Sequence, residues 1–404
     1  MVVEISSTLL YIAVILIAAK LGGFFAIRIG QLGVLGELVA GIMIGPSVAG
    51  WFSQRLFGTA LFIDLSSEAG AFVDLFAQIG IIFLLFLAGL SIDLEEFKKS
   101  EKPAALVATT GVVTAFLLGF SVASVLNWTP LKAAFVGAIL AATSVGITVR
   151  TLMDAHSLHT RVGMTIFGAA VIDDVIAIVI LSVLAGLAFG GLTFLGLAEN
   201  IALIALFFFL VLLVGFKTVP RLLAFVGRLR VEEVTLSIAL AMVFMIGALA
   251  EKMRVAAITG AFIAGLIMSR SPVAGSLRAK VSTIGYGLFI PIFFVAIGAR
   301  TNLGALAGAG FLAVALVIIA MFDKVVGCGV GALASGFGLK DSLRVGVGMM
   351  PRAEIALVIA AIGASAGIVG TELLSMAVIV VLITSLITPP LVKFVFKGAQ
   401  PKKK

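Results

Sequence analysis

The feature that most constrains this chain is a series of apolar segments, each long enough to cross a membrane, from one end to the other. A helix needs about 20 apolar residues to span the ~30 Å hydrocarbon layer. Hydrophobic residues make up 62% of the chain and charged residues 12%, against ~45–50% and ~25% in soluble proteins. The sequence therefore predicts an all-α polytopic membrane protein, a single membrane-spanning unit over residues 1–404. It predicts thirteen spans, at about 8–27, 31–48, 71–91, 104–126, 131–153, 163–189, 198–225, 234–250, 255–268, 281–299, 307–335, 343–366 and 373–396.

The distribution of lysine and arginine predicts how these spans are oriented. Thirteen crossings place the two termini on opposite sides, and basic residues collect in cytoplasmic loops. When basic residues near the end of a span, such as Arg150, are counted with the adjoining loop, twenty of the 28 fall in one alternating set of loops and ends and five in the other set, while three lie deeper within spans. We therefore expect the N-terminus outside and the C-terminus in the cytoplasm. The net charge of +8 does not indicate a nucleic-acid partner, because the basic residues are spread between spans and form no single patch.

Six spans, one connecting span and six more spans form a layout that permits two inverted six-helix repeats. Transporters built this way carry broken helices at matching positions of the two halves. The fifth span contains Ala142-Thr-Ser-Val-Gly-Ile-Thr148, where small and hydroxyl residues interrupt the apolar run. The twelfth contains Pro351, which removes a backbone donor and disfavours helix at the residue before it. Unwound backbone at membrane depth needs protein or water to satisfy it, so both stretches are expected to line a central site.

Asp173 and Asp174 are consecutive carboxylates in the middle of the apolar sixth span. One charge near the bilayer centre costs at least ~2.5–3.5 kcal/mol on the insertion scale, so such residues usually bind or carry an ion. Neighbours on a helix point ~100° apart, so one can face a protein partner while the other faces a cavity. The alternative, a solvated helix end, conflicts with several turns of apolar sequence on both sides.

Lys324 lies within the long eleventh span and requires a counter-charge if it is buried. The aspartate pair can supply that charge from a neighbouring helix. Asp323 is the rival partner, although adjacency on a helix makes direct pairing awkward. The alternative is a lysine whose ammonium reaches the membrane interface along its apolar stem.

Further polar residues are weaker candidates. Arg352 and Glu354, beside the predicted break, are expected mainly to hold the crossing together. The oxygens of Thr143, Ser144 and Thr148 can bind a cation or serve helix packing. Three residues near the cytoplasmic side are possible modulators: Glu37, His156 and His159. The two histidines can titrate near neutrality, or they can belong to an ordinary solvated loop.

Four motifs together resemble bacterial sodium/proton antiporters of the monovalent cation:proton antiporter-2 family, NapA type. They are the 142–148 stretch, Gly168-Ala-Ala-Val-Ile-Asp-Asp-Val175, Lys324-Val-Val-Gly and Val345-Gly-Val-Gly-Met-Met-Pro-Arg-Ala-Glu354. The resemblance implies an NhaA-like fold and a homodimer. Its core helices would lie at about 71–189 and 280–366, and its dimerisation or scaffold helices at about 8–48, 198–270 and 371–396.

By the same resemblance, Asp174 is the main ion-binding carboxylate, Asp173 the partner of Lys324, and Thr143 a further sodium ligand. The Asp-Asp pair with a core lysine implies electrogenic exchange of cytoplasmic Na⁺ (or Li⁺) for external H⁺. Two departures are Ala353, where a glycine is common, and Asp323, where an uncharged residue is expected; Asp323 leaves the stoichiometry open.

The expected protein is a secondary transporter of the inner membrane of a prokaryote, neither an enzyme nor the holder of a cofactor. Potassium/proton exchange is the main alternative. A cation channel, an organic-anion transporter and an intramembrane aspartyl protease are less favoured. Such a protease draws its two aspartates from different helices, whereas these are adjacent on one helix.

Overall fold

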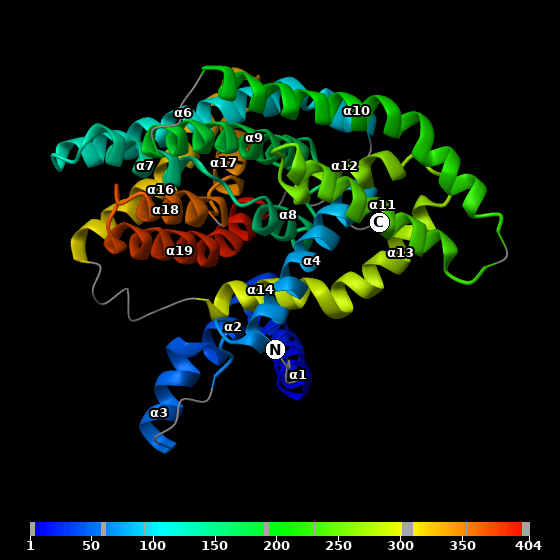
Figure 1. The fold of residues 1–404 in the computed structure, drawn as a ribbon, viewed down its shortest axis with the longest axis horizontal. Helices are drawn as coiled ribbons and strands as arrows, with labels where there is room; N and C mark the ends of the chain where they lie inside the picture. The colour runs from blue at the N-terminus through cyan, green and yellow to red at the C-terminus, as the bar shows by residue number, and fades with distance from the viewer. Residues whose placement is uncertain are drawn as a thin grey trace.

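In the computed structural model, every regular element of the described residues is helical (Figure 1). The described residues are 5–57, 62–92, 94–189, 194–229, 231–300, 310–352 and 354–397. The helices of the first half are α1 (Ile5–Arg28), α2 (Gly33–Ile44), the π-helical turn η1 (Pro46–Gly50), α3 (Trp51–Phe57), α4 (Glu68–Ser91), α5 (Leu94–Lys99), α6 (Glu101–Val125), α7 (Pro130–Ala141), α8 (Val145–Asp154) and α9 (Arg161–Phe189). Those of the second half are α10 (Phe194–Val226), α11 (Val234–Lys252), α12 (Ala257–Met268), α13 (Ala274–Ile284), the π-helical turn η2 (Gly285–Phe289), α14 (Ile290–Ala299), α16 (Gly310–Ala334), α17 (Leu339–Gly348), α18 (Glu354–Ser365) and α19 (Thr371–Val395).

Within the described ranges, eleven helical segments are long and apolar enough to cross a membrane. Three of them join neighbouring elements, at Gly33–Leu56, Pro130–Asp154 and Ala274–Ala299. Two apolar helices are shorter than a full crossing, Ala257–Met268 and Ile355–Ser365. The second is short because the predicted span 343–366 is divided between α17 and α18. The all-helical membrane class is confirmed, and the count of thirteen crossings stays a prediction.

Both predicted helix interruptions are present. Helix α7 ends at Ala141, and α8 begins at Val145. Between them, the backbone is extended at Ala142 and Ser144. Ser144 starts α8 because its hydroxyl accepts the Ile147 amide at 3.3 Å, which satisfies one otherwise unpaired N–H group of the new helix. Helix α17 ends at Gly348 and α18 begins at Glu354, on either side of Pro351, which cannot donate a helical hydrogen bond.

The helices pack in two groups. In the first group, α1 packs on α2, α2 on α14, α14 on α4 and α4 on α12. The second group consists of α6, α7, α8, α9, α16, α17, α18 and α19, several of which lie side by side in Figure 1. Close approach in the first group requires glycine. A Cβ added at Gly89 of α4 would collide with the Phe262 carbonyl of α12, and one at Gly265 of α12 with the Phe86 carbonyl of α4, as expected where helices pack through small residues.

This grouping differs from the predicted core and scaffold ranges at three helices. Helices α4 and α14 pack with α1, α2 and α12, and α19 packs with α16, α17 and α18. Long-range packing of this kind is not encoded in hydropathy, which is similar in all of these helices. The division into a moving core and a scaffold stays a prediction, as does the inverted repeat.

Candidate functional site

The two consecutive aspartates lie in the middle of α9. The side chain of Asp173 is fully buried, and Asp174 is 2% exposed. Helix α9 continues without interruption from Arg161 to Phe189, so neither carboxylate lies at a solvated helix end. Their burial requires compensation from charges or polar groups of neighbouring helices.

Lys324 of α16 provides that compensation for Asp173. Its Nζ donates to both carboxylate oxygens, at 3.2 Å and 3.0 Å, and both side chains are 0% exposed. The ammonium therefore does not reach a membrane interface. Gly111 of α6 allows this packing, because a Cβ there would collide with Cys328 Sγ and lie 3.7 Å from the Lys324 Nζ.

Asp323, the residue before this lysine, pairs with a different cation. Its Oδ1 accepts from the Arg352 NH2 at 2.7 Å, and both side chains are fully buried. The expected rivalry between Asp323 and Asp173 for Lys324 is thus absent from this arrangement. Successive residues of α16 face different helices, so Lys324 meets α9 while Asp323 meets the break between α17 and α18.

Arg352 binds the end of the broken helix as well as Asp323. Its NH1 donates to the carbonyls of Met349 and Met350, at 3.4 Å and 3.3 Å, and its NH2 donates to the Ala320 carbonyl of α16 at 3.1 Å. The last carbonyls of a helix have no intrahelical donor and carry partial negative charge. The guanidinium satisfies these carbonyls and holds the break against α16.

The two interruptions contact each other directly. The Ser144 amide donates to the Pro351 carbonyl at 2.7 Å, and the Thr148 hydroxyl donates to the Gly348 carbonyl at 3.1 Å. Ser144 and Thr148 therefore join the two interruptions through hydrogen bonds. The buried Thr143 hydroxyl has no hydrogen-bond partner in the described part of the chain, which leaves its oxygen available to a ligand.

Two hydroxyl residues of α19, absent from the sequence prediction, hold the unwound backbone at Arg352. The Arg352 amide donates to Thr384 Oγ1 at 3.1 Å, and the Ser385 hydroxyl donates to the Arg352 carbonyl at 3.2 Å. Both are buried, so the polar backbone of this residue is satisfied without water. The sequence signal was a run of hydroxyls, Thr384, Ser385 and Thr388, inside an otherwise apolar span.

Glu37 is buried in α2 and pairs with Arg150 of α8, with 3.4 Å between Oε1 and NH2. The Arg150 Nε lies 3.0 Å from Asp154 Oδ1, and its guanidinium covers the Tyr286 ring at 4.6 Å. Arg150, which the sequence analysis counted among cytoplasmic loop residues, is therefore buried and ties α8 to α2. None of the contacts described for Glu37 involves the aspartate pair.

Three predicted residues lie outside these clusters or outside the described side chains. His156 and His159 are exposed between α8 and α9, and their modulating role stays a prediction. Glu354 begins α18, but its side chain is outside the described residues, as is Ala353.

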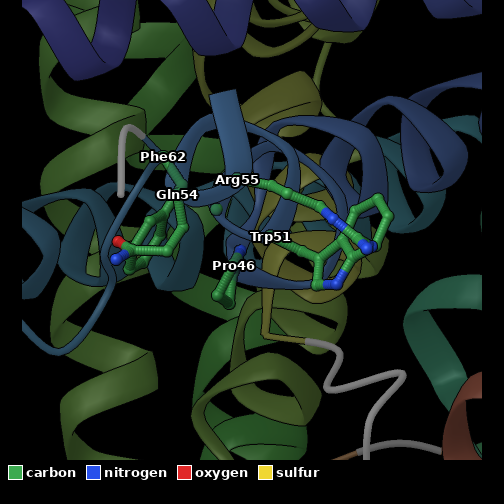
Figure 2. Close-up of a pocket in the computed structure, with 6 residues that line it drawn as sticks. Pro46, Trp51, Gln54, Arg55 and Phe62 are labelled. Carbon is green, nitrogen blue, oxygen red and sulfur yellow. The ribbon is translucent and has the colours of Figure 1, made fainter. Parts of the chain in front are cut away.

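A surface hollow is found elsewhere, at the end of the α2–α3 segment. Figure 2 shows it between η1, α3 and Phe62, with Arg55 beside Trp51; the guanidinium carbon is 5.2 Å from the ring centroid. Its lining shares no residue with the aspartate, arginine or hydroxyl clusters: Pro46, Gly50, Trp51, Gln54, Arg55 and Phe62.

The central arrangement combines buried carboxylates, two buried cations and unwound backbone. Buried carboxylates can hold a proton or a small cation, and a lysine paired with one of them can respond when that carboxylate changes its ligand. These are the elements of ion binding and proton exchange within a membrane.

Comparison with known proteins points in the same direction. Residues 12–398 match a family model described as sodium/hydrogen exchanger, transmembrane. The chain is 37% identical to the Na(+)/H(+)-K(+) antiporter GerN of Bacillus cereus over 396 residues, 97% of this chain and 96% of the relative. It is 31% identical to a Na(+)/H(+) antiporter of Enterococcus hirae over 387 residues, 96% and 97% of the two chains. The solved sodium proton antiporter MjNhaP1 from Methanocaldococcus jannaschii is similar in fold, with a TM-score of 0.68, 18% identity and 98% coverage of both chains.

Proposed function

The chain belongs to the sodium/hydrogen exchanger family, and on this premise we propose that it is a secondary active sodium/proton antiporter. It is a multi-pass membrane protein that exchanges cytoplasmic Na⁺, or Li⁺, for external H⁺. The observation that carries the proposal is the fully buried Asp173–Lys324 pair with Asp174 as the next residue. Asp173 and Asp174 lie in α9 and Lys324 lies in α16. Both helices belong to the packed group that contains the two broken helices.

Exchange follows from competition at the carboxylates. With protons bound, Asp174 is neutral and Lys324 is paired with Asp173. A sodium ion requires ionised carboxylates, so its arrival displaces the protons and weakens the hold of Asp173 on Lys324. Because protons and sodium cannot occupy the same oxygens together, each crossing carries one or the other.

Asp174, Asp173 and the Thr143 hydroxyl are the proposed sodium ligands. Hard cations prefer oxygen ligands, and Thr143 is the hydroxyl at the crossing without a hydrogen-bond partner in the described part of the chain. Ser144, Thr148, Arg352 and Glu354 are assigned to supporting the crossing.

Alternating access requires a body that carries the site to move past a body that stays in place. The helices that pack around the site, α6, α7, α8, α9, α16, α17, α18 and α19, are the proposed moving body. In this proposal the protein has thirteen crossings in two inverted six-helix repeats, with its N-terminus outside and its C-terminus cytoplasmic. It forms a homodimer in the plasma membrane of a prokaryote.

Lys324 is proposed to make the exchange electrogenic: once sodium draws Asp173 away from it, Lys324 releases its proton, so that two protons, one from Asp174 and one from Lys324, are exchanged for each sodium ion. Replacing Lys324 by Gln should lower the charge moved per sodium ion or flatten the pH dependence. An unchanged charge-to-sodium ratio in that variant would remove Lys324 from the coupling and leave it a structural role.

Purified protein in liposomes containing a pH-sensitive dye tests the function. Addition of Na⁺ or Li⁺ should move protons with a rate that saturates with cation concentration and depends on the pH gradient. Ohmic current without proton coupling would indicate a channel. The relative GerN includes K⁺ in its name, so potassium/proton exchange is the second candidate, and a response to K⁺ alone would establish it.

A further inference from the structure

Asp323 and Lys324 are consecutive and fully buried residues of α16 that pair with opposite charges on different elements. Their Cα atoms are about 3.8 Å apart. The Arg352 guanidinium and the Asp173 carboxylate are thus held at neighbouring points of one helix. Charges buried this close to one another are poorly screened by water or salt.

Arg352 would repel a transported cation if it were not neutralised. Its contacts with the carbonyls of Met349, Met350 and Ala320 offer only partial negative charge. In the described part of the chain, Asp323 supplies the full opposite charge, at 2.7 Å. Only one carboxylate oxygen of Asp323 is used, because Oδ2 has no hydrogen-bond partner among the described residues.

The five buried charged residues described around the site carry a net negative formal charge. Asp173, Asp174 and Asp323 bring three negative charges, and Lys324 and Arg352 bring two positive charges. With all five ionised, one negative charge remains, which a single monovalent cation or proton neutralises. Without Asp323 the same cluster is neutral before any ion arrives.

We propose that Asp323 sets the cation affinity of the transport site: by neutralising Arg352 it keeps the buried cluster negative, so that a monovalent cation is attracted. The proposal rests on the proposed function, since it assigns the cation to the Asp173–Asp174 site. The two buried ion pairs then have different roles. The Lys324–Asp173 pair exchanges ligands, whereas the Arg352–Asp323 pair stays intact through the cycle.

The test compares sodium affinity in four proteins in liposomes: wild type, Asp323→Asn, Arg352→Gln and the double variant. An uncompensated unit charge at ~10 Å, at an effective dielectric constant of ~20, changes a binding constant on the order of tenfold. Asp323→Asn should therefore raise the half-saturating Na⁺ concentration on the order of tenfold. The double variant should return to within about threefold of the wild type, because its formal charge is again one negative.

The matched control is Asp341→Asn, which removes the same group from a partly exposed Asp341–Arg344 pair on α17. It should leave sodium affinity unchanged. Sodium-dependent protection against heat, measured in detergent, provides a second readout that needs no transport. The affinity order from both readouts should agree.

Several results would overturn the proposal. If Asp323→Asn keeps wild-type sodium affinity while wild type transports normally, only this inference fails. If the folded double variant is as weak as Asp323→Asn, the residue has a purely structural role. If Asp323→Asn does not fold, Arg352→Gln carries the test, because it should bind Na⁺ at least as tightly as wild type, and weaker binding contradicts the proposal. Absence of any sodium response in wild type would overturn the proposed function and this inference together.

Discussion

The ion pair between Lys324 and Asp173 makes a quantitative prediction, because the protein contains an exposed pair of almost the same geometry. The Lys324 Nζ lies 3.2 Å and 3.0 Å from the two Asp173 oxygens, with both side chains 0% exposed. The Lys280 Nζ lies 3.0 Å and 2.8 Å from the two Glu233 oxygens, with side chains 45% and 56% exposed. Burial is thus the main difference between the two pairs.

Replacing Lys324 by Gln leaves a carboxylate buried without its cation. Breaking a buried pair in this way costs about 3–5 kcal/mol, whereas breaking an exposed pair costs about 0–1 kcal/mol. The free energy of unfolding in detergent at neutral pH should therefore fall by about 3–5 kcal/mol in Lys324→Gln and by at most about 1 kcal/mol in Lys280→Gln. The double variant Asp173→Asn with Lys324→Gln should recover most of the loss, because no unpaired charge remains.

Two outcomes would refute this reasoning. The first is a Lys324→Gln variant no less stable than Lys280→Gln, which would mean that Asp173 has other compensation. The second is a double variant whose loss equals the sum of the two single losses, since residues in direct contact should be strongly non-additive.

Two further variants test the supports of the site. Thr384→Val removes the acceptor of the buried Arg352 amide and should cost about 1–3 kcal/mol of unfolding free energy. Thr388→Val should cost less, because among the described residues its hydroxyl bonds only its own helix; equal losses would deny Thr384 a special role. Glu37→Gln weakens the buried ion pair with Arg150 and should lower the free energy of unfolding by about 1.5–3 kcal/mol, measured by the same denaturation. No loss would show that the contact with Asp154 is enough to compensate the buried Arg150.

The sequence predicted the buried charges around Asp173 better than the contacts that surround them. Charges inside apolar runs are conspicuous, so Asp173, Asp174 and Lys324 could be selected without a structure, and Pro351 marked a helix break. Arg150 was misplaced because an arginine near the end of a predicted span is usually solvated, whereas here Glu37 of a distant helix pairs with it.

Other features depended on contacts that no local pattern encodes. Hydroxyls such as Thr384 commonly bond their own helix in apolar segments, and nothing in the sequence indicates that this one also receives the Arg352 amide. The choice of Arg352 as the partner of Asp323, and the packing of α19 with α16, α17 and α18, likewise follow from tertiary structure.

Sodium-driven proton movement in liposomes, compared between wild type and Asp174→Asn, tests the central claim most directly. The account predicts a saturating dye response to sodium in wild type and none in the variant, because the asparagine can neither release a proton nor present a charged ligand to the cation. Sustained sodium-driven proton movement in folded Asp174→Asn protein would contradict the assignment of Asp174 as the exchanging carboxylate.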